Sequence, residues 1–514
     1  MTSRDSSTFK STWVWVFGIA LFYFALHLAT STRYGYFRDA LYYLACSEHL
    51  AFGYVDQPPL IAFVGWFARH TLGTSLPALL FWPALAGASR IVLTAVFARE
   101  LGASRFGILL AATLAATPGV WWVMDHQFAM NCFEPLLWGG LAYVVLRLIK
   151  TGNPKLWLSF GAIAGVGLLN KYSIVFFAAA LIAGLLLTPQ RKVLFTPWIL
   201  AGGALAFLIF LPNLIWNIQN GWPFLELMRN VRATGKDIVL PPHEYLIQQI
   251  LMMNPATLPF WFGGLLFLFL SRHQKNYRTL GFAFVIVIAF LMISHGKIYY
   301  SAPAYVMLFA AGGVATERLL AGLKLQVVLR PVCFVWLVLA VVLLLPLFLP
   351  VLPIEKFIRY QSYLPFDISK TERSFIGESL PQYYADEFPW PGMVEAVARV
   401  YHSLTPEEQK RTAIFGNNYG QAAAIDFFGP KYGLPKAISG HQNYFLWGPR
   451  EYTGDIVIVL GDLETTAREQ FNSVTVAATL NNPYAYRYEN RPILLCRDLK
   501  WNFQTEWHRI KNWR

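Results

Sequence analysis

Charged side chains gather between Tyr34 and Leu60, in a chain of which only 14% of the residues are charged. Asp39 lies a few residues after an apolar run and has Arg38 and Tyr42 as neighbours. A carboxylate in that position can accept the proton of a hydroxyl group and act as a general base. The alternative is a structural Asp39 that pairs with Arg38 and completes the end of a helix.

A second carboxylate, Asp56, stands shortly before the pair Pro58-Pro59. Proline fixes the backbone angle φ, so the pair predicts a rigid turn. Such a turn can hold a substrate beside Asp39, and it can equally be a plain connection between two helices. We therefore assign Asp39 as the candidate base, with three candidate substrate-binding neighbours: Arg38, Tyr42 and Asp56.

Two single cations, Lys171 and Lys297, each lie at the end of an apolar run. A cation there can stabilise a phosphate group that gains charge as it leaves a substrate, and Tyr299 and Tyr300 add hydroxyl groups and ring faces beside Lys297. The alternative is that both lysines are structural and extend toward water from helix ends. Glu134 lies about one turn into another apolar run, where an unpaired carboxylate is costly, so we expect it to shape the site.

The composition predicts a polytopic α-helical membrane protein, because 56% of the residues are hydrophobic. The net charge of +13 lies entirely before residue 351, since residues 351–514 carry equal numbers of basic and acidic residues. The basic residues form short clusters between apolar runs. This pattern is typical of cytoplasmic loops and argues against nucleic-acid binding.

Spanning the bilayer takes about 20 apolar residues, and we predict about eleven transmembrane helices. The region 156–187 is too long for one span, so we expect a hairpin that turns at Asn170-Lys171. Basic clusters fall on every second connection, which places the other connections outside the cytoplasm. The outer connections then carry the polar candidates, namely Asp39, Asp56, Asp125, Glu134, Lys171, His243, Glu244 and Lys297.

We divide the chain into a transmembrane domain, 1–352, and a soluble extracytoplasmic α/β domain, 353–514. The first extracytoplasmic loop covers about residues 32–76 and carries Asp39. In the second domain, the apolar runs Ala413–Phe415 and Asp455–Leu460 predict strands, and Gly420–Phe428 predicts a helix.

The chain contains no P-loop, no GxGxxG fingerprint and no large cytoplasmic domain to bind a nucleotide. An enzyme at the outer face therefore needs an activated substrate that arrives through the membrane, most simply on a lipid phosphate. The four cysteines of the chain are far apart in the sequence and indicate neither a zinc site nor a disulfide framework.

Several motifs resemble the GT-C integral-membrane glycosyltransferases, in particular the family 39/83-like group that includes protein O-mannosyltransferases and the aminoarabinose transferases of lipid A. The motifs are YFRDALYYLA, GYVDQPPL, MNCFEPLLW, GLLNKYS and HGKIYYSAPAY, in this order. The resemblance covers about residues 10–320. The segments FGNNYGQAAAIDFFG and SGHQNYFLWGP resemble a bacterial subset of the family.

The resemblance implies that Asp39 is the catalytic carboxylate of the first extracytoplasmic loop. It also implies a polyprenyl-phosphate sugar as donor, inversion at the anomeric carbon by direct displacement, and Lys171 and Lys297 near the donor phosphate. Relatives often have a second acid where this chain has Ala40 and a His or Lys where it has Gln57, which leaves the acceptor class open. Some relatives bind a divalent metal ion near this loop. Here only Asp56, His243 and Glu244 are loosely placed candidate ligands, so we assign no metal site, and a divalent metal ion stays open as a cofactor.

The sequence thus predicts an inner-membrane glycosyltransferase that moves a single sugar to a lipid, glycan or protein hydroxyl on the periplasmic face, surrounded by membrane lipids. Two other classes stay open. A transporter or lipid flippase places ionisable groups near the middle of the membrane and often shows inverted repeats, which are not visible here. A non-catalytic subunit of a cell-envelope glycan assembly complex can keep the same fold.

Overall fold

The chain forms two units, each with its own hydrophobic core. The computed structural model describes residues 3–236, 238–364, 372–376 and 378–514. The membrane unit consists of Met1–Arg33, Pro77–Leu214 and Val239–Pro365, and the sheet unit consists of Tyr34–Leu76, Ile215–Ile238 and Phe366–Arg514. The domain division at residues 352 and 353 stays a prediction. In the structure, the first loop belongs to the same unit as the C-terminal sheet.

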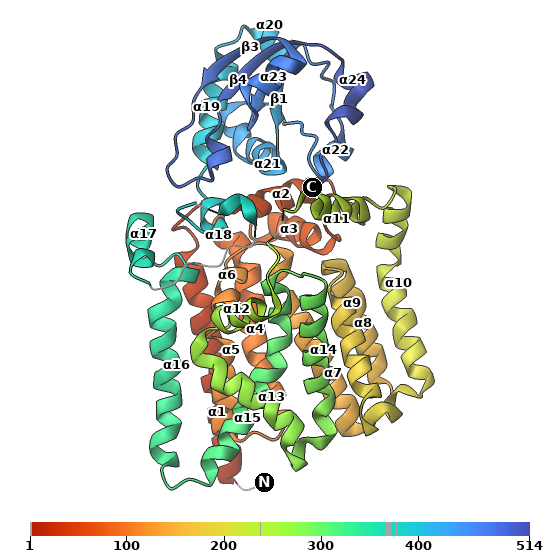
Figure 1. Ribbon diagram of the computed structural model, residues 1–514, viewed down its shortest axis with the longest axis vertical. Helices are drawn as coiled ribbons and strands as arrows, with labels where there is room; N and C mark the ends of the chain where they lie inside the picture. The colour runs from red at the N-terminus through yellow and green to blue at the C-terminus, as the bar shows by residue number, and fades with distance from the viewer. Residues whose placement is uncertain (1–2, 237, 365–371, 377) are drawn as a thin grey trace. The chain divides into compact units, whose positions relative to one another are not determined.

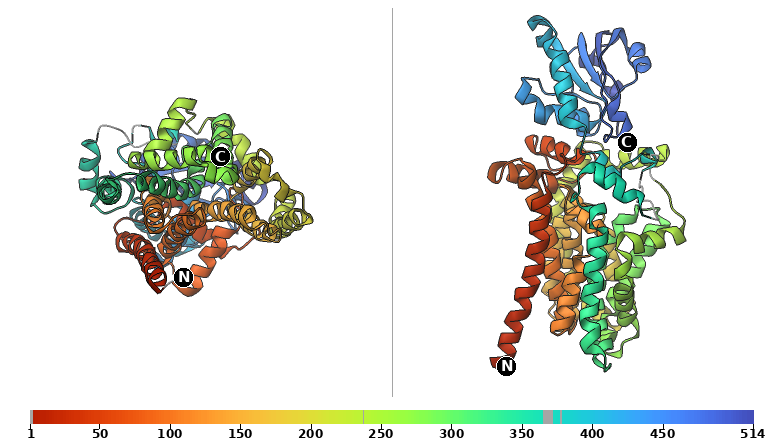
Figure 2. Two further views of the ribbon diagram at one scale, coloured as in Figure 1. Left: turned by 90° about the horizontal axis from the view of Figure 1, so that it is seen from below. Right: turned by 90° about the vertical axis from the view of Figure 1, so that its left-hand side faces the viewer.

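The membrane unit is built from apolar helices, which Figure 1 shows from the side and Figure 2 (left) shows end-on. Their bounds are α1 Ser3–Thr30, α4 Leu76–Glu100, α5 Arg105–Ala115, α6 Gly119–Met124, α7 Glu134–Thr151, α8 Leu156–Asn170, α9 Ile174–Leu186, α10 Pro197–Gln219, α12 Pro242–Met252, α13 Leu258–Leu270, α14 Arg278–Ile293, α15 Tyr305–Ala321, α16 Gln326–Phe348 and α17 Ile354–Ser362. Short 3₁₀ helices connect them: η1 Met130–Cys132, η2 Pro189–Leu194, η3 Pro255–Thr257, η4 Arg272–Tyr277 and η5 Ile298–Ala304.

Among the described residues, seven helical stretches are long and apolar enough to cross a membrane. An eighth span is possible from α12 and η3–α13, which are bent by 91°. The bend falls at Asn254, whose φ of 66° and following proline cannot continue a helix. The prediction of a polytopic helical membrane protein is confirmed. The predicted eleven transmembrane helices would be reached only if the shorter apolar helices α5, α8 and α9 also cross the membrane. That number stays a prediction.

Small residues allow the helices of the membrane unit to pack closely. α15 packs against α5 and α13. A Cβ at Gly264 of α13 would lie 2.6 Å from the carbonyl oxygen of Leu308, and a Cβ at Gly312 would lie 2.4 Å from that of Phe260. Only glycine at these positions lets the two backbones come so near each other.

The predicted hairpin at Asn170-Lys171 is confirmed, because α8 ends at Asn170 and α9 begins at Ile174. The buried Asn170 side chain donates a hydrogen bond to the carbonyl oxygen of Met130 at 3.0 Å. This bond holds the turn against the start of α7 and thereby places Lys171.

The sheet unit contains a four-stranded mixed sheet in the order β1-β2-β4-β3. β1 and β2 are parallel, and the other two pairings are antiparallel. Its elements are α2 Arg38–Glu48, α3 Leu60–Thr71, α11 Pro223–Thr234, η6 Arg373–Phe375, α18 Gln382–Ala385, α19 Trp390–His402, α20 Pro406–Arg411, β1 Thr412–Gly416, α21 Tyr419–Phe428, η7 Gly429–Tyr432, α22 Asn443–Trp447, β2 Ile456–Leu460, α23 Glu464–Gln470, β3 Phe471–Ala478, η8 Arg487–Asn490, β4 Ile493–Leu499, α24 Phe503–Glu506 and η9 Trp507–Ile510.

Both predicted strands and the predicted helix of the C-terminal region are present, as β1, β2 and α21. All five residues of β2 are buried, which explains why its sequence is continuously apolar rather than alternating. α21 packs against β1, α19 and α2 (Figure 1). The helix that carries Asp39 is therefore held by the unit that contains the sheet.

Candidate functional site

Asp39 lies in the first turn of α2, and its Oδ1 accepts a hydrogen bond from the hydroxyl group of Tyr419 at 2.7 Å. Tyr419 is the first residue of α21. The Asp39 side chain is 29% exposed, and among the described residues no group donates a hydrogen bond to its Oδ2. One carboxylate oxygen is thus fixed in place, while the other can accept a proton.

Arg38 pairs mainly with a residue other than Asp39. Its Nη2 lies 3.1 Å from Oδ2 of the buried Asp386, whereas its Nε lies 3.9 Å from Asp39. The guanidinium also lies 5.5 Å from the centre of the Tyr419 ring. Gly420 makes room for this side chain, because a Cβ there would lie 2.4 Å from Cγ of Arg38. A purely structural pair of Asp39 with Arg38 therefore does not describe the site.

The second predicted carboxylate, Asp56, is held by Tyr42, whose hydroxyl group donates a hydrogen bond to Oδ1 at 2.9 Å. The backbone N–H of Asn443 in turn donates to the Tyr42 hydroxyl oxygen at 3.3 Å. Burial raises the pKa of Asp56 to about 7, against the opposing effect of the Tyr42 hydrogen bond, and the negative charge of Asp39 adds to the rise. Burial likewise raises the pKa of Asp386 to about 7, although Arg38 lowers it.

Together these residues form what we call the Asp39 cluster, in the sheet unit: Arg38, Asp39, Tyr42, Asp56, Asp386 and Tyr419. The sequence predicted the first four. Asp386 and Tyr419 were missed as site residues, because more than 300 positions separate them from α2. The segment FGNNYGQAAAIDFFG, which contains Tyr419, carried the one sequence signal toward them.

In the membrane unit, Lys171 is held at the turn between α8 and α9. Its Nζ lies 2.8 Å from Oδ1 of Asn131 and 2.9 Å from Oε2 of Glu134. Its ammonium group also lies 4.4 Å from the centre of the Tyr300 ring and 5.8 Å from that of Tyr299. A cation over aromatic faces is attracted by their negative charge distribution. The structure thus brings four predicted residues together: Glu134, Lys171, Tyr299 and Tyr300.

Glu134 begins α7 and is buried, and its second oxygen accepts a hydrogen bond from the hydroxyl group of Ser173. The ion pair with Lys171 and this bond satisfy the carboxylate, as the cost of an unpaired acid inside an apolar run requires. We call this set the Lys171 cluster: Asn131, Glu134, Lys171, Ser173, Tyr299 and Tyr300. Asn131 and Ser173 were not predicted.

Two further candidates belong to the membrane unit. Lys297 is the half-buried residue that precedes η5. Asp125 is fully buried and pairs with Arg90 at 2.6 Å, and it accepts a hydrogen bond from Tyr23 at 2.7 Å, so its contacts are structural.

The three metal candidates belong to different units of the chain. His243 and Glu244 are exposed at the start of α12 in the membrane unit, whereas Asp56 belongs to the sheet unit. Throughout the described ranges, no group of three or more His, Cys, Asp or Glu side chains is arranged to hold a metal ion.

Comparisons with known proteins give the fold. The chain is similar to ArnT from Cupriavidus metallidurans bound to undecaprenyl phosphate, with a TM-score of 0.59 and 15% identity over 94% of this chain and 97% of that one. Its apo structure gives a TM-score of 0.58 and 14% identity, over 95% and 98% of the two chains. The chain has the ArnT-like GT-C fold.

Two sequence comparisons point to the same glycosyltransferase group. The family model described as dolichyl-phosphate-mannose-protein mannosyltransferase matches residues 56–216. The lipid A galacturonosyltransferase RgtD of Rhizobium johnstonii is 29% identical over 191 residues, which are 36% of this chain and 39% of RgtD. The match thus spans well under half of that relative. The predicted resemblance to GT-C glycosyltransferases is confirmed, and the family-model match includes Asp56, Glu134 and Lys171 but begins after Asp39.

Proposed function

We propose that the protein is a membrane glycosyltransferase that moves one sugar from a polyprenyl phosphate to a hydroxyl group of a lipid. The observation that carries the proposal is the Asp39 carboxylate, fixed by Tyr419 through one oxygen, in a chain of the GT-C fold. The undecaprenyl phosphate in ArnT supports the donor class, and the name of RgtD supports a lipid acceptor. A glycan or protein acceptor is the alternative.

In the proposed reaction, Asp39 takes the proton of the acceptor hydroxyl group. The acceptor oxygen forms a bond to the anomeric carbon of the sugar while the bond between that carbon and the phosphate oxygen breaks. The bonding electrons leave with the polyprenyl phosphate, and the anomeric centre is inverted. A positioned general base of this kind contributes about 10²- to 10⁴-fold to a rate.

Asp56 and Tyr42 have a supporting part in this proposal. With a pKa of about 7, the Asp56 carboxyl group is protonated in roughly half of the molecules at neutral pH. It can therefore donate a hydrogen bond to an acceptor oxygen or accept one from an acceptor hydroxyl. We assign Asp56 to acceptor binding on this ground.

The Lys171 cluster is assigned to the donor phosphate. A leaving phosphate gains negative charge as its bond to the sugar breaks, and a fixed cation lowers the energy of that state. Glu134, Asn131 and the Tyr300 ring hold the ammonium group in one position, so it need not reorganise during the reaction. Lys297, one residue before η5, is assigned to the same task from its sequence position.

For the membrane, we propose the bacterial inner membrane, with Asp39 and the C-terminal sheet on the periplasmic side. The support is the distribution of basic clusters, which fall on every second connection between apolar runs.

The test is transfer of radiolabelled sugar from a panel of undecaprenyl-phosphate sugars by the purified full-length protein in lipid. We expect the wild type to use one donor and Asp39→Asn to lose at least about 100-fold in kcat. The matched control is Glu48→Gln, which removes a carboxylate from the same helix but from a surface pair with Arg69 and Lys436. It should keep full activity.

Other outcomes would contradict the proposal. Equal activity of wild type and Asp39→Asn would exclude Asp39 as the base. No transfer from any donor by folded protein would favour a transporter, a flippase or a non-catalytic assembly subunit.

A further inference from the structure

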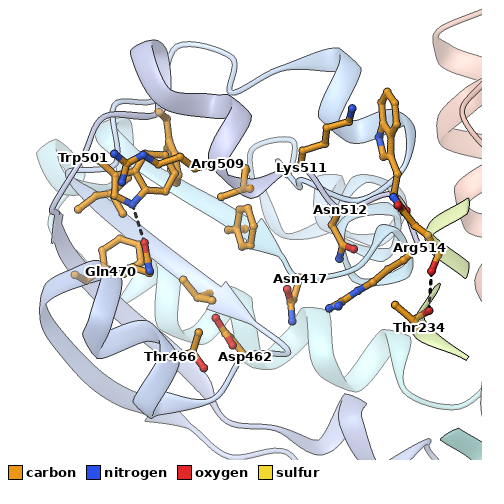
Figure 3. A pocket seen from close by; sticks show the side chains of 18 of the residues that line it. Thr234, Asn417, Asp462, Thr466, Gln470, Trp501, Arg509, Lys511, Asn512 and Arg514 are labelled. Atoms are coloured by element: carbon orange, nitrogen blue, oxygen red, sulfur yellow. Dashed lines mark hydrogen bonds between the residues drawn. The ribbon is translucent and has the colours of Figure 1, made fainter. Parts of the chain in front are cut away.

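The sheet unit contains a cavity of about 520 Å³ at the carboxyl ends of the parallel strands β1 and β2. Phe415 of β1 and Val459 of β2 line it. Asn417 and Asp462, which follow these two strands, line it as well (Figure 3). α11, α23 and the segment 499–514 complete its walls. Ligands of sheets with parallel strands bind in this place, because the loops that leave the strand ends diverge there.

The polar lining of the cavity suits a ligand with several hydroxyl groups. Asn417, Asp462, Thr466 and Asn512 present amide, carboxylate and hydroxyl groups toward it (Figure 3). Each sugar hydroxyl both donates and accepts a hydrogen bond, and these side chains offer partners for both.

The cavity also has an aromatic wall. Trp501, Phe503 and Phe415 line it, and the Trp501 indole N–H donates a hydrogen bond to Oε1 of Gln470 at 2.8 Å, which fixes its ring. Apolar CH faces of a sugar ring pack on such rings. Aromatic surface together with a few placed polar groups is the usual composition of a small-molecule site.

Three cations line the cavity, and two of them are already paired. Lys511 lies 2.7 Å from Glu226 and packs over the Trp513 ring, and Arg509 lies 2.5 Å from Glu506. Arg514 extends toward Asn417 (Figure 3). Across the described part of the chain, no carboxylate lies within ion-pair distance of its guanidinium. An anionic group on the ligand would supply that partner, in a bidentate geometry that arginine favours.

A continuous set of hydrogen bonds joins this cavity to the Asp39 cluster within the sheet unit. Nδ1 of the buried His441 accepts a hydrogen bond from the backbone N–H of Tyr419 at 3.2 Å, and its Nε2 lies 3.2 Å from the carbonyl oxygen of Arg514. Burial lowers the pKa of His441 to about 3, so the ring is neutral, with Nε2 as the donor. The turn that carries Asn417 therefore also holds the Tyr419 that binds Asp39.

We propose that this cavity binds an anionic saccharide, namely a sugar of the acceptor that carries a phosphate or carboxylate group. The inference rests on the proposed function for its biological meaning, because the Asp39 cluster is the site to which the acceptor must be presented. The binding itself does not depend on transfer. Arg514 would bind the anionic group, the polar lining side chains would hydrogen-bond to the hydroxyl groups, and the aromatic wall would pack on the face of the sugar ring.

The experiment measures binding of N-acetylglucosamine 1-phosphate to the full-length protein in nanodiscs by ligand-observed NMR. Neutral N-acetylglucosamine and inorganic phosphate serve as comparison probes. We expect saturable binding of the sugar phosphate, at least tenfold tighter than that of either comparison probe. Similar affinity for the neutral sugar would overturn the anionic part of the proposal, and similar affinity for inorganic phosphate would overturn the saccharide part.

Two variants locate the binding. Arg514→Gln should weaken binding of the sugar phosphate at least tenfold, whereas Arg399→Gln, which removes an exposed cation of α19 away from the cavity, should leave it unchanged. Ala233→Trp, on the exposed side of α11 that lines the cavity, should abolish binding by filling the space. Unchanged binding in both cavity variants would overturn the assignment.

The Asp39→Asn variant separates this inference from the proposed function. It should bind the probe as the wild type does while transfer is lost. Transfer by the wild type without any probe binding would contradict the cavity assignment alone. Probe binding without transfer from any donor would contradict the proposed function alone.

Discussion

At the scale of single residues, two side chains can interact with the Asp39 carboxylate, and the distances show that Tyr419 is its main partner. The Tyr419 hydroxyl group is at 2.7 Å, and the nearest Arg38 nitrogen is at 3.9 Å. A close bidentate pair with arginine makes a carboxylate a weaker proton acceptor. Because Arg38 is directed to Asp386 at 3.1 Å, it can position α2 without occupying the carboxylate that we assign as the base.

Asp56 gives a pH dependence with a definite sign. Its pKa is about 7 in the folded protein, against an ordinary value of 3.8 for an aspartate in water. Between these values the folded state binds more protons than the unfolded state, so the stability of the sheet unit falls as pH rises from about 4 to 7 and is level above that range. Asp56→Asn cannot ionise and should show a smaller fall in Tm between about pH 5 and pH 8.

The control for this prediction is Asp498→Asn, which changes an exposed carboxylate of the same unit. It should keep the wild-type slope of Tm against pH. Part of the slope should persist in Asp56→Asn, because burial also raises the pKa of Asp386. Identical slopes in wild type and Asp56→Asn would show that Asp56 ionises freely in the folded protein.

Lys171 gives a prediction about the donor. Lys171→Gln removes the cation and leaves Glu134 buried without its ion pair, so we expect a clear loss of kcat/KM for the polyprenyl-phosphate sugar, on the order of tenfold or more. The measurement is initial-rate transfer at varied donor concentration. Lys150→Gln, which breaks a surface pair with Glu100, is the matched control. An unchanged kcat/KM in Lys171→Gln would exclude Lys171 from donor binding.

At the scale of elements, α2 and α21 meet through a position that has no side chain. A Cβ at Gly420 would collide with Cγ of Arg38 at 2.4 Å and with Cδ at 2.7 Å. Relief requires either a new rotamer of Arg38, which would disturb its pair with Asp386, or a shift of α2. A shift of α2 would move the Asp39 carboxylate away from the Tyr419 hydroxyl group.

Gly420→Ala is therefore expected to reduce transfer about tenfold or more without removing any polar group. Gly392→Ala in α19 is the control, because a Cβ at that position would meet no neighbouring atom within 4 Å. That change should leave transfer intact and raise helix stability by about 0.5–1 kcal/mol. Transfer assays and thermal unfolding distinguish the two variants, and full activity of Gly420→Ala would mean that Arg38 adjusts at no cost to the site.

At the scale of the whole molecule, the sheet unit is assembled from three separated stretches of chain. The first loop contributes α2 and α3, and α2, whose residues Ala40–Ser47 are all buried, packs against α21 and α3 of the same unit. The first loop is therefore not an independent part of the protein. Its order depends on residues near the other end of the chain.

Deleting residues 366–514 should therefore abolish transfer rather than merely alter the choice of acceptor. The deletion removes Tyr419 and Asp386 and exposes the buried face of α2, so we also expect rapid proteolysis within Tyr34–Leu76. Limited proteolysis with mass spectrometry checks this outcome, and monodisperse elution of the shortened protein confirms that its membrane helices remain folded. Full transfer by the shortened protein would contradict the role that we assign to the sheet unit.

The sequence by itself determined the features that depend on local pattern. Continuous apolar runs predicted the helices of the membrane unit and the buried strand β2, and the polar break at Asn170-Lys171 predicted the hairpin. Unusual charges in apolar surroundings singled out Asp39, Asp56, Glu134 and Lys171. Each of these signals lies within a few residues of the feature that it predicts, because burial and bilayer crossing act on every short segment of the chain.

Only the tertiary structure showed which residues are the hydrogen-bond and ion-pair partners of the candidate site residues. Tyr419 as the donor to Asp39, Asp386 as the partner of Arg38 and Asn131 beside Lys171 all join segments whose sequence separation carries no periodic signal. The pKa of Asp56 and the cavity beside β1 and β2 depend likewise on burial by distant segments. The chemical groups of a side chain follow from its residue type alone, whereas its environment depends on the segments that the folded chain packs around it.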